Sequence, residues 1–381
     1  MKRILVVVCL IGLGGTLEMV GQSDRDVRAD SIFRVAVALI DDAQYDEAFG
    51  ILEEANENFP EFSAFTFEQG YVRMLQRRYK ESAMIFESIL DSPDANGRYY
   101  SMLGNAYDLA GDSENAVATY VKGLERFPNA GEIYVELGTM RAKAEEYQAA
   151  AETWEQGIAA DPDYPSNYFR AAQMYLPTAY RGWGILYGEM FVLLELNSER
   201  SYQMRDMLHR AYDEAYSYEP GEDSTEYSFN IEFFGDGLSV LSTDSGLFAP
   251  YATFSATALF SPAIGLNIEG RPSVAWLHEQ RTGFLQAWYD NEEVAAFYDV
   301  SLYAYHRRMV DAGLFEAYNH MLLACESTRE EVENWVTAHP EEIERLGAWL
   351  AENPYDAERN PFSRPTLGIF PFDPASAGPS V

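Results

Sequence analysis

Small and large side chains recur along this chain with a period of 34 residues, without a gap, from Ala29 to Tyr164. In each of the four copies the eighth and twentieth positions hold glycine, alanine or serine, and the twenty-fourth holds a large side chain. The eighth positions are Ala36, Gly70, Gly104 and Gly138, the twentieth are Ala48, Ser82, Ala116 and Ala150, and the twenty-fourth are Leu52, Phe86, Tyr120 and Trp154. The second copy departs twice, with Ile89 at an otherwise small twenty-seventh position and Asp94 where the other copies have proline.

The repeat predicts a helical hairpin in every copy. Ala48, Leu52 and Ala55 follow the i, i+4, i+7 spacing of one buried helical face, with acidic residues between them. The small residues let two antiparallel helices approach closely, and the bulky residue at the twenty-fourth position fills the seam. Proline then ends the second helix. Because one hairpin cannot bury its apolar face alone, the copies are expected to stack into an array.

The clearest copy contains Leu103-Gly104-x-x-Tyr107, followed by Ala116, Tyr120 and Pro128. With these residues the repeat resembles the tetratricopeptide-repeat family, over about a third of the chain. The resemblance implies a mostly α fold, in which residues 29–164 form four hairpins of a right-handed α-solenoid. It also implies a protein or peptide partner, because members of this family serve as scaffolds, chaperone adaptors and assembly factors.

In that family the first helix of each repeat lines a concave groove for peptides through its second, fifth, ninth and twelfth positions. Here the groove is expected to begin apolar and aromatic and to turn polar midway. The candidate partner-binding residues are Phe33, Phe67, Tyr71, Met74, Arg98, Asn105 and Asp108. A helix or extended segment anchored on the aromatic strip is the expected ligand, unless the protein's own next domain covers these side chains. A clamp for a partner's C-terminal carboxylate is the alternative, but only Arg98 and Asn105 fit it.

The strict repeat ends after Tyr164. Residues 165–220 are expected to form a degenerate repeat and helical extension, and residues 221–359 a mainly helical C-terminal domain. Alternating apolar residues around a Gly-Asp-Gly turn predict a small β-hairpin at 227–241. Five prolines in residues 360–381 predict an extended or loose tail.

Individual residues in these parts also predict local structure. Trp183 and Tyr187 are expected to be core aromatics of an apolar helix. A cap at Asn197 or Ser198 is expected to begin the next helix. Pro340, followed by two glutamates, predicts a further helix start, because proline and acidic side chains both suit the first turn.

Residues 1–22 are expected to be an export signal. Two basic residues are followed by an apolar stretch from Ile4 to Leu17, and cleavage is expected before Ser23. The apolar stretch is shorter than the ~20 residues that span a bilayer, so a retained anchor is the weaker alternative. A lipoprotein anchored at Cys9 is a further alternative. The expected location is therefore periplasmic or extracellular, without a stable membrane span once the signal is removed.

The chain is strongly acidic, with 61 Asp and Glu against 27 Lys and Arg and a formal net charge of −34 over 381 residues. This charge argues against nucleic acid and anionic lipid surfaces as partners, because like charges repel. Dissolved salt screens the repulsion between surface carboxylates, so the composition favours a salt-rich, halophilic habitat. An ordinary acidic exported protein is the alternative.

The sequence contains no local motif for catalysis, a metal or a cofactor, and we expect no residues in those roles. His320 and Cys325 are predicted to lie on different faces of a helix, and Cys325 is the lone cysteine after signal removal, so it forms no intrachain disulfide. The favoured function is therefore an exported scaffold or adaptor in the assembly or organisation of an envelope complex. A hydrolase or other enzyme with its site in the C-terminal domain is one alternative. Self-assembly through edge helices is another, and the oligomeric state stays open.

The acidic composition makes a prediction about salt. Repulsion between surface carboxylates should weaken in molar salt, because the Debye length falls from about 10 Å at 0.1 M to about 3 Å at 1 M. The melting temperature, followed by circular dichroism, should therefore rise between low and molar concentrations of salt. A melting temperature that stays constant or falls would contradict the halophilic interpretation.

Overall fold

The computed structural model describes residues 24–178, 181–216, 273–290 and 300–357. These residues are mostly helical, as the repeat pattern predicts. The predicted export signal, the domain boundary near residue 220, the β-hairpin at 227–241 and the tail at 360–381 lie outside the described residues. The chain divides into two compact units, Met1–Asp94 and Ala95–Val381, and each is described by itself.

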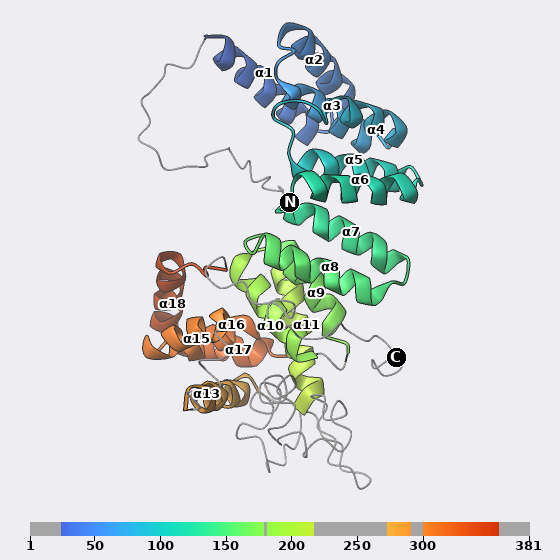
Figure 1. Ribbon diagram of the computed structural model, residues 1–381. Coiled ribbons are helices and arrows are strands. Elements are labelled where there is room, and N and C mark those ends of the chain that lie inside the picture. The colour runs from blue at the N-terminus through green and yellow to red at the C-terminus, as the bar shows by residue number, and fades with distance from the viewer. Residues whose placement is uncertain (1–23, 179–180, 217–272, 291–299, 358–381) are drawn as a thin grey trace. The chain divides into compact units, whose positions relative to one another are not determined.

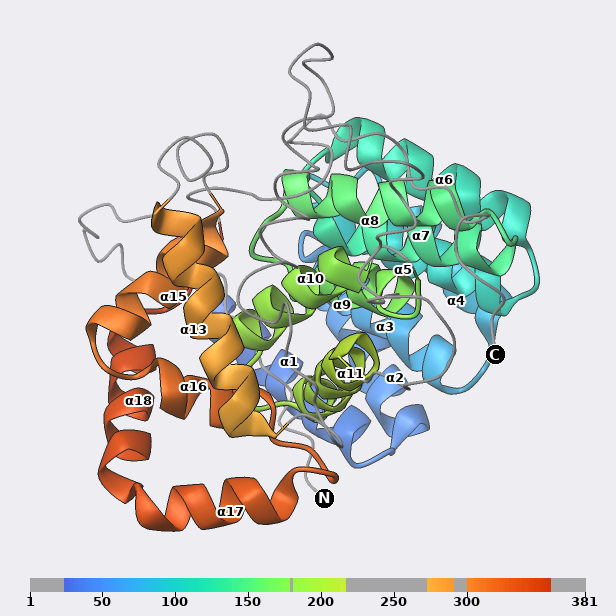
Figure 2. The same cartoon turned by 90° about the horizontal axis from the view of Figure 1, so that it is seen from below.

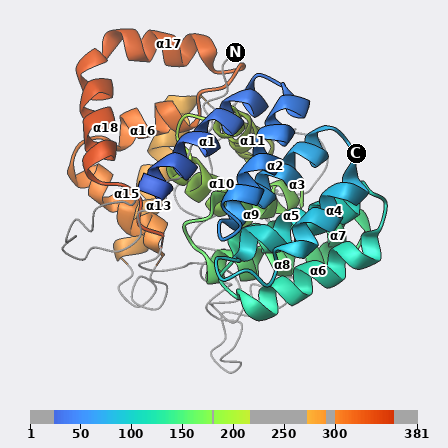
Figure 3. The same cartoon turned by 90° about the horizontal axis from the view of Figure 1, so that it is seen from above.

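The first unit consists of two helical hairpins, drawn in blue in Figures 1 and 3. Its helices are α1 (Asp24–Asp41), α2 (Tyr45–Asn58), α3 (Ser63–Leu75) and α4 (Tyr79–Ser88). Each helix packs against the next, and α1 also contacts α3. Ala36, Ala48 and Leu52 have no exposed surface, so the repeat positions predicted to be buried form the core of this unit.

The second unit begins with three more hairpins, which follow one another in green in Figure 1. Their helices are α5 (Gly97–Leu109), α6 (Ser113–Arg126), α7 (Gly131–Lys143), α8 (Tyr147–Ala160), α9 (Pro165–Tyr175) and α10 (Arg181–Leu194). The two helices of each pair have extensive contacts, and the first helices α5, α7 and α9 also contact one another in order. The predicted stack of hairpins is therefore confirmed for the third and fourth copies and continues into a fifth pair.

Within a hairpin, the ring at the twenty-fourth position lies where a Cβ at the eighth position would be. A Cβ added at the glycine would lie 2.8 Å from the Phe86 ring at Gly70, 2.2 Å from the Tyr120 ring at Gly104 and 2.3 Å from the Trp154 ring at Gly138. At the twentieth position of the second copy, the Ser82 hydroxyl donates to the Gly70 carbonyl at 2.7 Å, so the two small positions face each other. Glycine is required here because any larger side chain would separate the helices.

The small residue at the twenty-seventh position lets the next hairpin dock. A Cβ added at Gly123 would lie 2.7 Å from the Ile133 side chain, and one added at Gly157 would lie 2.5 Å from Asn167. Ile133 and Asn167 both belong to the first helix of the following copy. The second copy has Ile89 at this position, and the first unit ends five residues later, at Asp94.

The fifth hairpin keeps the close approach but changes the seam. Gly184 occupies its twentieth position, and a Cβ there would lie 2.6 Å from the backbone nitrogen of Leu176. Its twenty-fourth position is Gly188 rather than a bulky residue, and a Cβ there would lie 2.9 Å from Leu208 and Met204. Those side chains come from α11 (Glu199–Tyr216), so this seam is filled by a further helix. Gly184 and Gly188, which interrupt the repeat in the sequence, are therefore points of close packing between helices.

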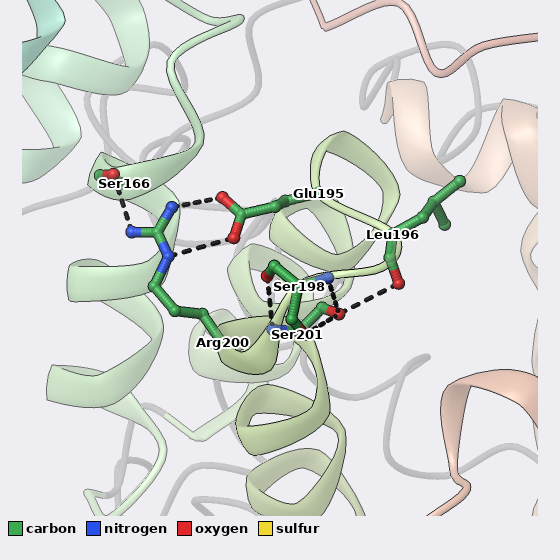
Figure 4. A network of polar contacts seen from close by, with 6 residues as sticks. All are labelled: Ser166, Glu195, Leu196, Ser198, Arg200 and Ser201. Atoms are coloured by element: carbon green, nitrogen blue, oxygen red, sulfur yellow. Dashed lines mark hydrogen bonds and ion pairs between the residues drawn. The ribbon is translucent and has the colours of Figure 1, made fainter. Parts of the chain in front are cut away.

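Capping bonds and an arginine fix the start of α11 (Figure 4). Ser198 caps the helix as predicted, since its hydroxyl accepts from Ser201 N–H at 3.1 Å while the Ser201 hydroxyl accepts from Ser198 N–H at 3.2 Å. Arg200 donates to Glu195, the residue that follows α10, and to the Ser166 hydroxyl of α9 at 2.9 Å. The start of α11 is thus bonded to α9 and to the segment that leaves α10.

The remaining helices form a bundle that shares its core with the end of the array. They are α13 (Val274–Asp290), α15 (Ser301–Asp311), α16 (Phe315–Leu322), α17 (Arg329–Ala338) and α18 (Pro340–Glu352). Figure 2 shows them together, and α16 contacts each of the other four. One continuous cluster of buried apolar side chains extends from α8 to α18, with Trp183 and Tyr187 almost fully buried in it, as predicted. The predicted helix start at Pro340 is also confirmed.

The hairpin of α15 and α16 has the turn of the repeats. In the first four hairpins the fifteenth position has a positive φ, from 58° at Ala43 to 84° at Gly111. The next N–H donates to a carbonyl five residues earlier, as Asp112 does to Tyr107 at 2.9 Å. Gly313 has a φ of 65°, and Leu314 N–H donates to the Met309 carbonyl at 2.8 Å. In this frame the eighth and twentieth positions are His306 and Tyr318, so the turn persists although the small residues do not.

The seam predicts a large cost for one added methyl group. Gly104→Ala should lower the free energy of unfolding by about 1–3 kcal/mol, because the new Cβ overlaps the Tyr120 ring. Gly347→Ala in α18 is the matched control: nothing lies within 4 Å of its added Cβ, so alanine should stabilise by about 0.5–1 kcal/mol. Urea unfolding measures both. Equal effects of the two substitutions would contradict the packing described for the seam.

Candidate protein-binding face

In the second unit, the first helices of three successive hairpins present a mixed-charge surface. We call it the A-helix face. It is formed by side chains of α5, α7 and α9, namely Arg98, Asn105, Asp108, Glu132, Glu136, Lys143 and Arg170. Its members are exposed or half-buried. The face carries both signs of charge, since Arg98, Lys143 and Arg170 lie among the carboxylates.

The amide of Asn105 is already bonded on both sides. Tyr120 of α6 donates its hydroxyl hydrogen to Asn105 Oδ1 at 2.6 Å, and Asn105 Nδ2 donates to Glu136 Oε1 of α7 at 3.3 Å. The same tyrosine ring fills the seam against Gly104. Packing within one hairpin therefore orients a polar group that bridges to the next.

Asp108 and Arg98 lie towards opposite ends of α5. Asp108 accepts from Lys143 Nζ of α7 at 2.6 Å, in an ion pair whose lysine is largely exposed. Arg98 is exposed near the start of α5, and its charge acts on the Glu132 carboxylate. The three predicted polar residues of this unit thus lie on one face and each interacts, directly or through charge, with α7.

Two carboxylates on α7 are only partly compensated. Burial raises the pKa of Glu136, more than the Asn105 hydrogen bond and the charges of Arg170 and Lys143 lower it. Burial also raises the pKa of Glu132, with Arg98 as a minor opposing charge. Glu132 lines a shallow hollow of about 400 Å³, together with Arg126, Phe127 and neighbouring residues of the loop between α6 and α7. The A-helix face therefore holds carboxylates that an additional cation would stabilise.

The predicted residues of the first unit lie on α1 and α3. Phe33, Tyr71 and Met74 are half-buried, and Phe33 packs 6.2 Å from the Phe65 ring. Phe67 is 4% exposed and packs 5.3 Å from the Phe86 ring of α4, so little of it is open to solvent. All four side chains belong to the first unit.

Phe67 occupies the fifth position of its repeat. Its counterparts in the third and fourth copies, Ser101 and Val135, are 5% and 8% exposed, whereas Phe33 of the first copy is half-buried. The Phe67 ring packs on the second helix of its own hairpin, through Phe86. The second, ninth and twelfth positions keep more exposure, as Arg98, Asn105 and Asp108 do.

A buried charge cluster, absent from the sequence expectations, joins the array to the C-terminal bundle. Glu189 of α10 is 2% exposed and accepts from Arg281 Nη2 of α13 at 2.6 Å. His306 Nε2 of α15 lies 3.2 Å from the same carboxylate. Two tyrosines donate to it as well: Tyr212 of α11 at 3.1 Å and Tyr318 of α16 at 3.5 Å. Five helices thus meet at one carboxylate.

The electrostatics of this cluster favour an ionised glutamate. Burial alone would raise the pKa of Glu189, but the Arg281 guanidinium and the His306 ring lower it to about 2. Burial lowers the pKa of His306, so its ring is neutral at neutral pH. His306 and Tyr318 stand at the eighth and twentieth positions of the sixth hairpin, with ring centroids 5.5 Å apart. In the other hairpins small residues meet at these positions. Here the two larger side chains both contact the Glu189 carboxylate of α10.

The sequence contained one signal for this cluster. Glu189 is the single acidic residue in the otherwise apolar stretch from Trp183 to Leu194. An ionised side chain inside a buried helix requires a partner, so its position alone indicates a buried ion pair. Arg281 and His306 carry no such local signal.

Comparison with known families identifies the hairpins. Residues 101–165 match the tetratricopeptide repeat family, from the fifth position of the third copy through the fourth copy. The chain contains tetratricopeptide repeats. The match lies within the stacked hairpins α5 to α8 and reaches the start of α9, where the small and bulky positions have the contacts described above. Within the described residues, each helix is too short or too polar to cross a bilayer.

Several solved structures of repeat proteins are similar to part of the chain. A thermophilic tetratricopeptide-repeat protein of Thermus thermophilus is 15% identical, with a TM-score of 0.39, and the match covers 48% of this chain and 98% of that one. PilF of Pseudomonas aeruginosa is 16% identical, with a TM-score of 0.39, over 56% and 100% of the two chains. YrrB, described as having an unusual peptide-binding site, is 16% identical, with a TM-score of 0.33, over 47% and 95%. No curated protein matches this chain.

The buried cluster predicts that removing one partner of the ion pair lowers the free energy of unfolding more than removing both partners. Glu189→Leu should lower the free energy of unfolding by about 3–5 kcal/mol, because it leaves the Arg281 guanidinium buried without its carboxylate. The double variant Glu189→Leu, Arg281→Leu should recover part of that loss. Urea unfolding of the three proteins measures the difference. A double variant less stable than the single one would show that the pair is not the main partner of each charge.

Proposed function

We propose that this chain is an exported scaffold that holds a protein or peptide segment on the A-helix face, and that the held segment presents basic side chains to Glu132 and Glu136. Tetratricopeptide-repeat proteins bind protein or peptide partners, which supports the general function. The finer proposal rests on one observation: burial raises the pKa of both carboxylates, which lie half-buried on a face that stays open to solvent.

The chemistry of the face favours a cation over an anion. A lysine or arginine side chain next to Glu136 would offset the cost of its burial and lower its pKa, so binding would release a proton where the carboxyl is partly protonated. A partner with basic side chains is also attracted by the net charge of −34. Both the local and the long-range electrostatics therefore support a basic segment.

A carboxylate clamp fits this face less well. Asn105, which would have to donate to a partner's carboxylate, already donates to Glu136. A carboxylate placed beside Asn105 would lie next to Glu136 as well, and the two negative charges would repel. Arg98 alone remains of the pair that the sequence offered for this role.

The first unit supplies a second surface of different chemistry. Phe33, Tyr71 and Met74 are half-buried apolar side chains on the first helices of its two hairpins. Aromatic side chains provide large contact areas for an apolar side chain of a partner. We propose that this strip binds apolar side chains of the partner.

The setting of the function is the cell envelope. The export signal expected at residues 1–22 and the periplasmic or extracellular location are part of the proposal, as is a role in the assembly or organisation of an envelope complex. The acidic composition supports a salt-rich environment. A partner that co-localises with this chain would then be another exported or membrane-bound protein.

Photo-crosslinking in native cells tests the proposal. A photoreactive side chain at Thr139, on α7, should capture a partner, and one at Ala118, on the exposed side of α6, should not. Adding Glu136→Gln to the Thr139 variant should reduce capture about tenfold or more, because it removes a charge-assisted contact while the amide still accepts from Asn105. Stability should stay constant or rise, because glutamine avoids the cost of a partly buried charge.

Glu114→Gln is the matched control, since Glu114 is exposed on α6 and carries the same change of charge. Capture should be unaffected by it. The proposal is wrong if Glu136→Gln leaves capture unchanged, or if Glu114→Gln reduces it equally. Capture of a segment without basic side chains would contradict the proposal that Glu132 and Glu136 recognise positive charge.

A further inference from the structure

A thiol and an imidazole from distant parts of the chain lie together in the second unit. Cys325, Ser327 and Thr328 belong to the loop between α16 and α17, and His209 belongs to α11. Ser327 and His209 are 118 residues apart in the sequence. The fold therefore creates this group of side chains, and it lies outside both the A-helix face and the Glu189 cluster.

The contacts connect the thiol to the imidazole through a hydroxyl. Cys325 Sγ lies 3.1 Å from Ser327 Oγ, which lies 3.3 Å from His209 Nδ1. Thr328 Oγ1 is 3.4 Å from the same sulfur. Cys325 is half-buried, so the thiol keeps access to solvent. His209 is 4% exposed, and within the described residues its Nε2 has no hydrogen-bond partner.

The loop does not need the thiol or the imidazole for its shape. Thr328 Oγ1 accepts from Cys325 N–H at 3.0 Å and donates to the Leu323 carbonyl at 2.8 Å, and these bonds close the turn into α17. A buried imidazole with an unpaired nitrogen costs free energy. A polar group kept at such a cost, beside an accessible sulfur, indicates a chemical role.

The surroundings favour the thiolate. Burial alone would raise the pKa of Cys325, but hydrogen bonds with His209 and Ser327 outweigh it and lower the pKa to about 6. An unperturbed cysteine has a pKa of about 8.5. At neutral pH most of this thiol is therefore ionised, which is the state that reacts.

From this arrangement we propose that Cys325 is a reactive thiolate, paired with His209, that forms mixed disulfides with disulfide-bearing molecules. His209 accepts the thiol proton, directly or through Ser327. The Cys325 sulfur then attacks one sulfur of the incoming disulfide: a new S–S bond forms to Cys325, the old S–S bond breaks, and the released thiolate takes up a proton. The disulfide is the only co-reactant, and no net oxidant is required.

The prediction that His320 and Cys325 lie on different faces of one helix was wrong, because α16 ends at Leu322 and Cys325 lies in the loop that follows. His320, five residues before Cys325, stacks on Trp335 with ring centroids 4.2 Å apart, and its Nδ1 lies 3.0 Å from the Glu316 carbonyl. The histidine that accompanies the thiol comes from α11 instead. His320 therefore provides a matched control for His209.

The test is the pH dependence of the reaction with an aromatic disulfide, Ellman's reagent, in the full chain carrying Cys9→Ser. The rate should depend on an ionisation with a midpoint near 6. In the His209→Phe variant the midpoint should move towards about 8.5, and in His320→Phe it should stay near the original value. Cys325→Ser should abolish the reaction.

The size of the effect follows from two opposing factors. At pH 6 a shift of the pKa from about 6 to about 8.5 lowers the thiolate fraction roughly 150-fold. The more basic thiolate is about tenfold more nucleophilic, so the rate at pH 6 should fall roughly tenfold overall. Should His209→Phe fail to fold, Ser327→Ala, an exposed position, should still raise the midpoint by a smaller amount.

Two disulfides of different origin complete the experiment, with intact mass as the readout at pH 6 to 7. Glutathione disulfide represents a small-molecule source, and a disulfide-linked peptide dimer represents a protein source. An adduct on Cys325 with either one supports the proposal, and its mass identifies the source. A midpoint near 8.5 in the protein with His209 intact, or no adduct with either disulfide, would overturn it.

Discussion

The contact between a glycine and an aromatic ring inside the second, third and fourth hairpins is the constraint on which the array depends. Gly104 has no side chain, and the Tyr120 ring occupies the space that a Cβ would need. The two helices of the hairpin can approach closely only because the glycine has no side chain where the ring lies, and the same is true at Gly138 and Trp154. The close approach leaves one apolar edge uncovered, which the next hairpin covers through a second small residue such as Gly123. The first helices α5, α7 and α9 then lie next to one another and form the A-helix face. Tyr120 links both levels, since its ring fills the seam and its hydroxyl orients Asn105 on that face.

At the end of the array the contact between a glycine and a ring is absent, and a buried polar cluster lies next to its position. In the fifth hairpin the bulky residue of the seam is replaced by Gly188, and α11 fills the space. One residue further, Glu189 extends into a cluster with Arg281 and His306. The α15–α16 hairpin keeps the turn of the repeats, but it has His306 and Tyr318 where small residues would meet. A buried ion pair of this kind adds little net stability over an apolar contact, yet removing one partner is costly. We infer that it selects one way of packing the bundle on the last hairpin.

The repeats were predictable from the sequence because their contacts are local and recur at fixed spacing. The positions of Gly104 and Tyr120 follow from a single period, and the capped start of α11 at Ser198 follows from a few adjacent residues. The burial of Phe67 was not predictable from the family pattern, because a fifth-position side chain can face either solvent or its own second helix. The Glu189 cluster and the pair of Cys325 with His209 depend on packing between helices far apart in the chain. Glu189 alone gave a sign, as an acid in an apolar helix, whereas His209 and Cys325 are ordinary residues until the bundle brings them together.

The account therefore depends on a specific coupling between the eighth and twenty-fourth positions. A double-mutant cycle with Gly104→Ala and Tyr120→Leu, measured by urea unfolding, tests it most directly. Leucine removes the ring that the added methyl group overlaps, so the two substitutions together should cost less than the sum of the single ones, by about 1 kcal/mol or more. Effects that add within about 0.3–0.5 kcal/mol would contradict the account, because they would show that the glycine and the ring do not depend on each other.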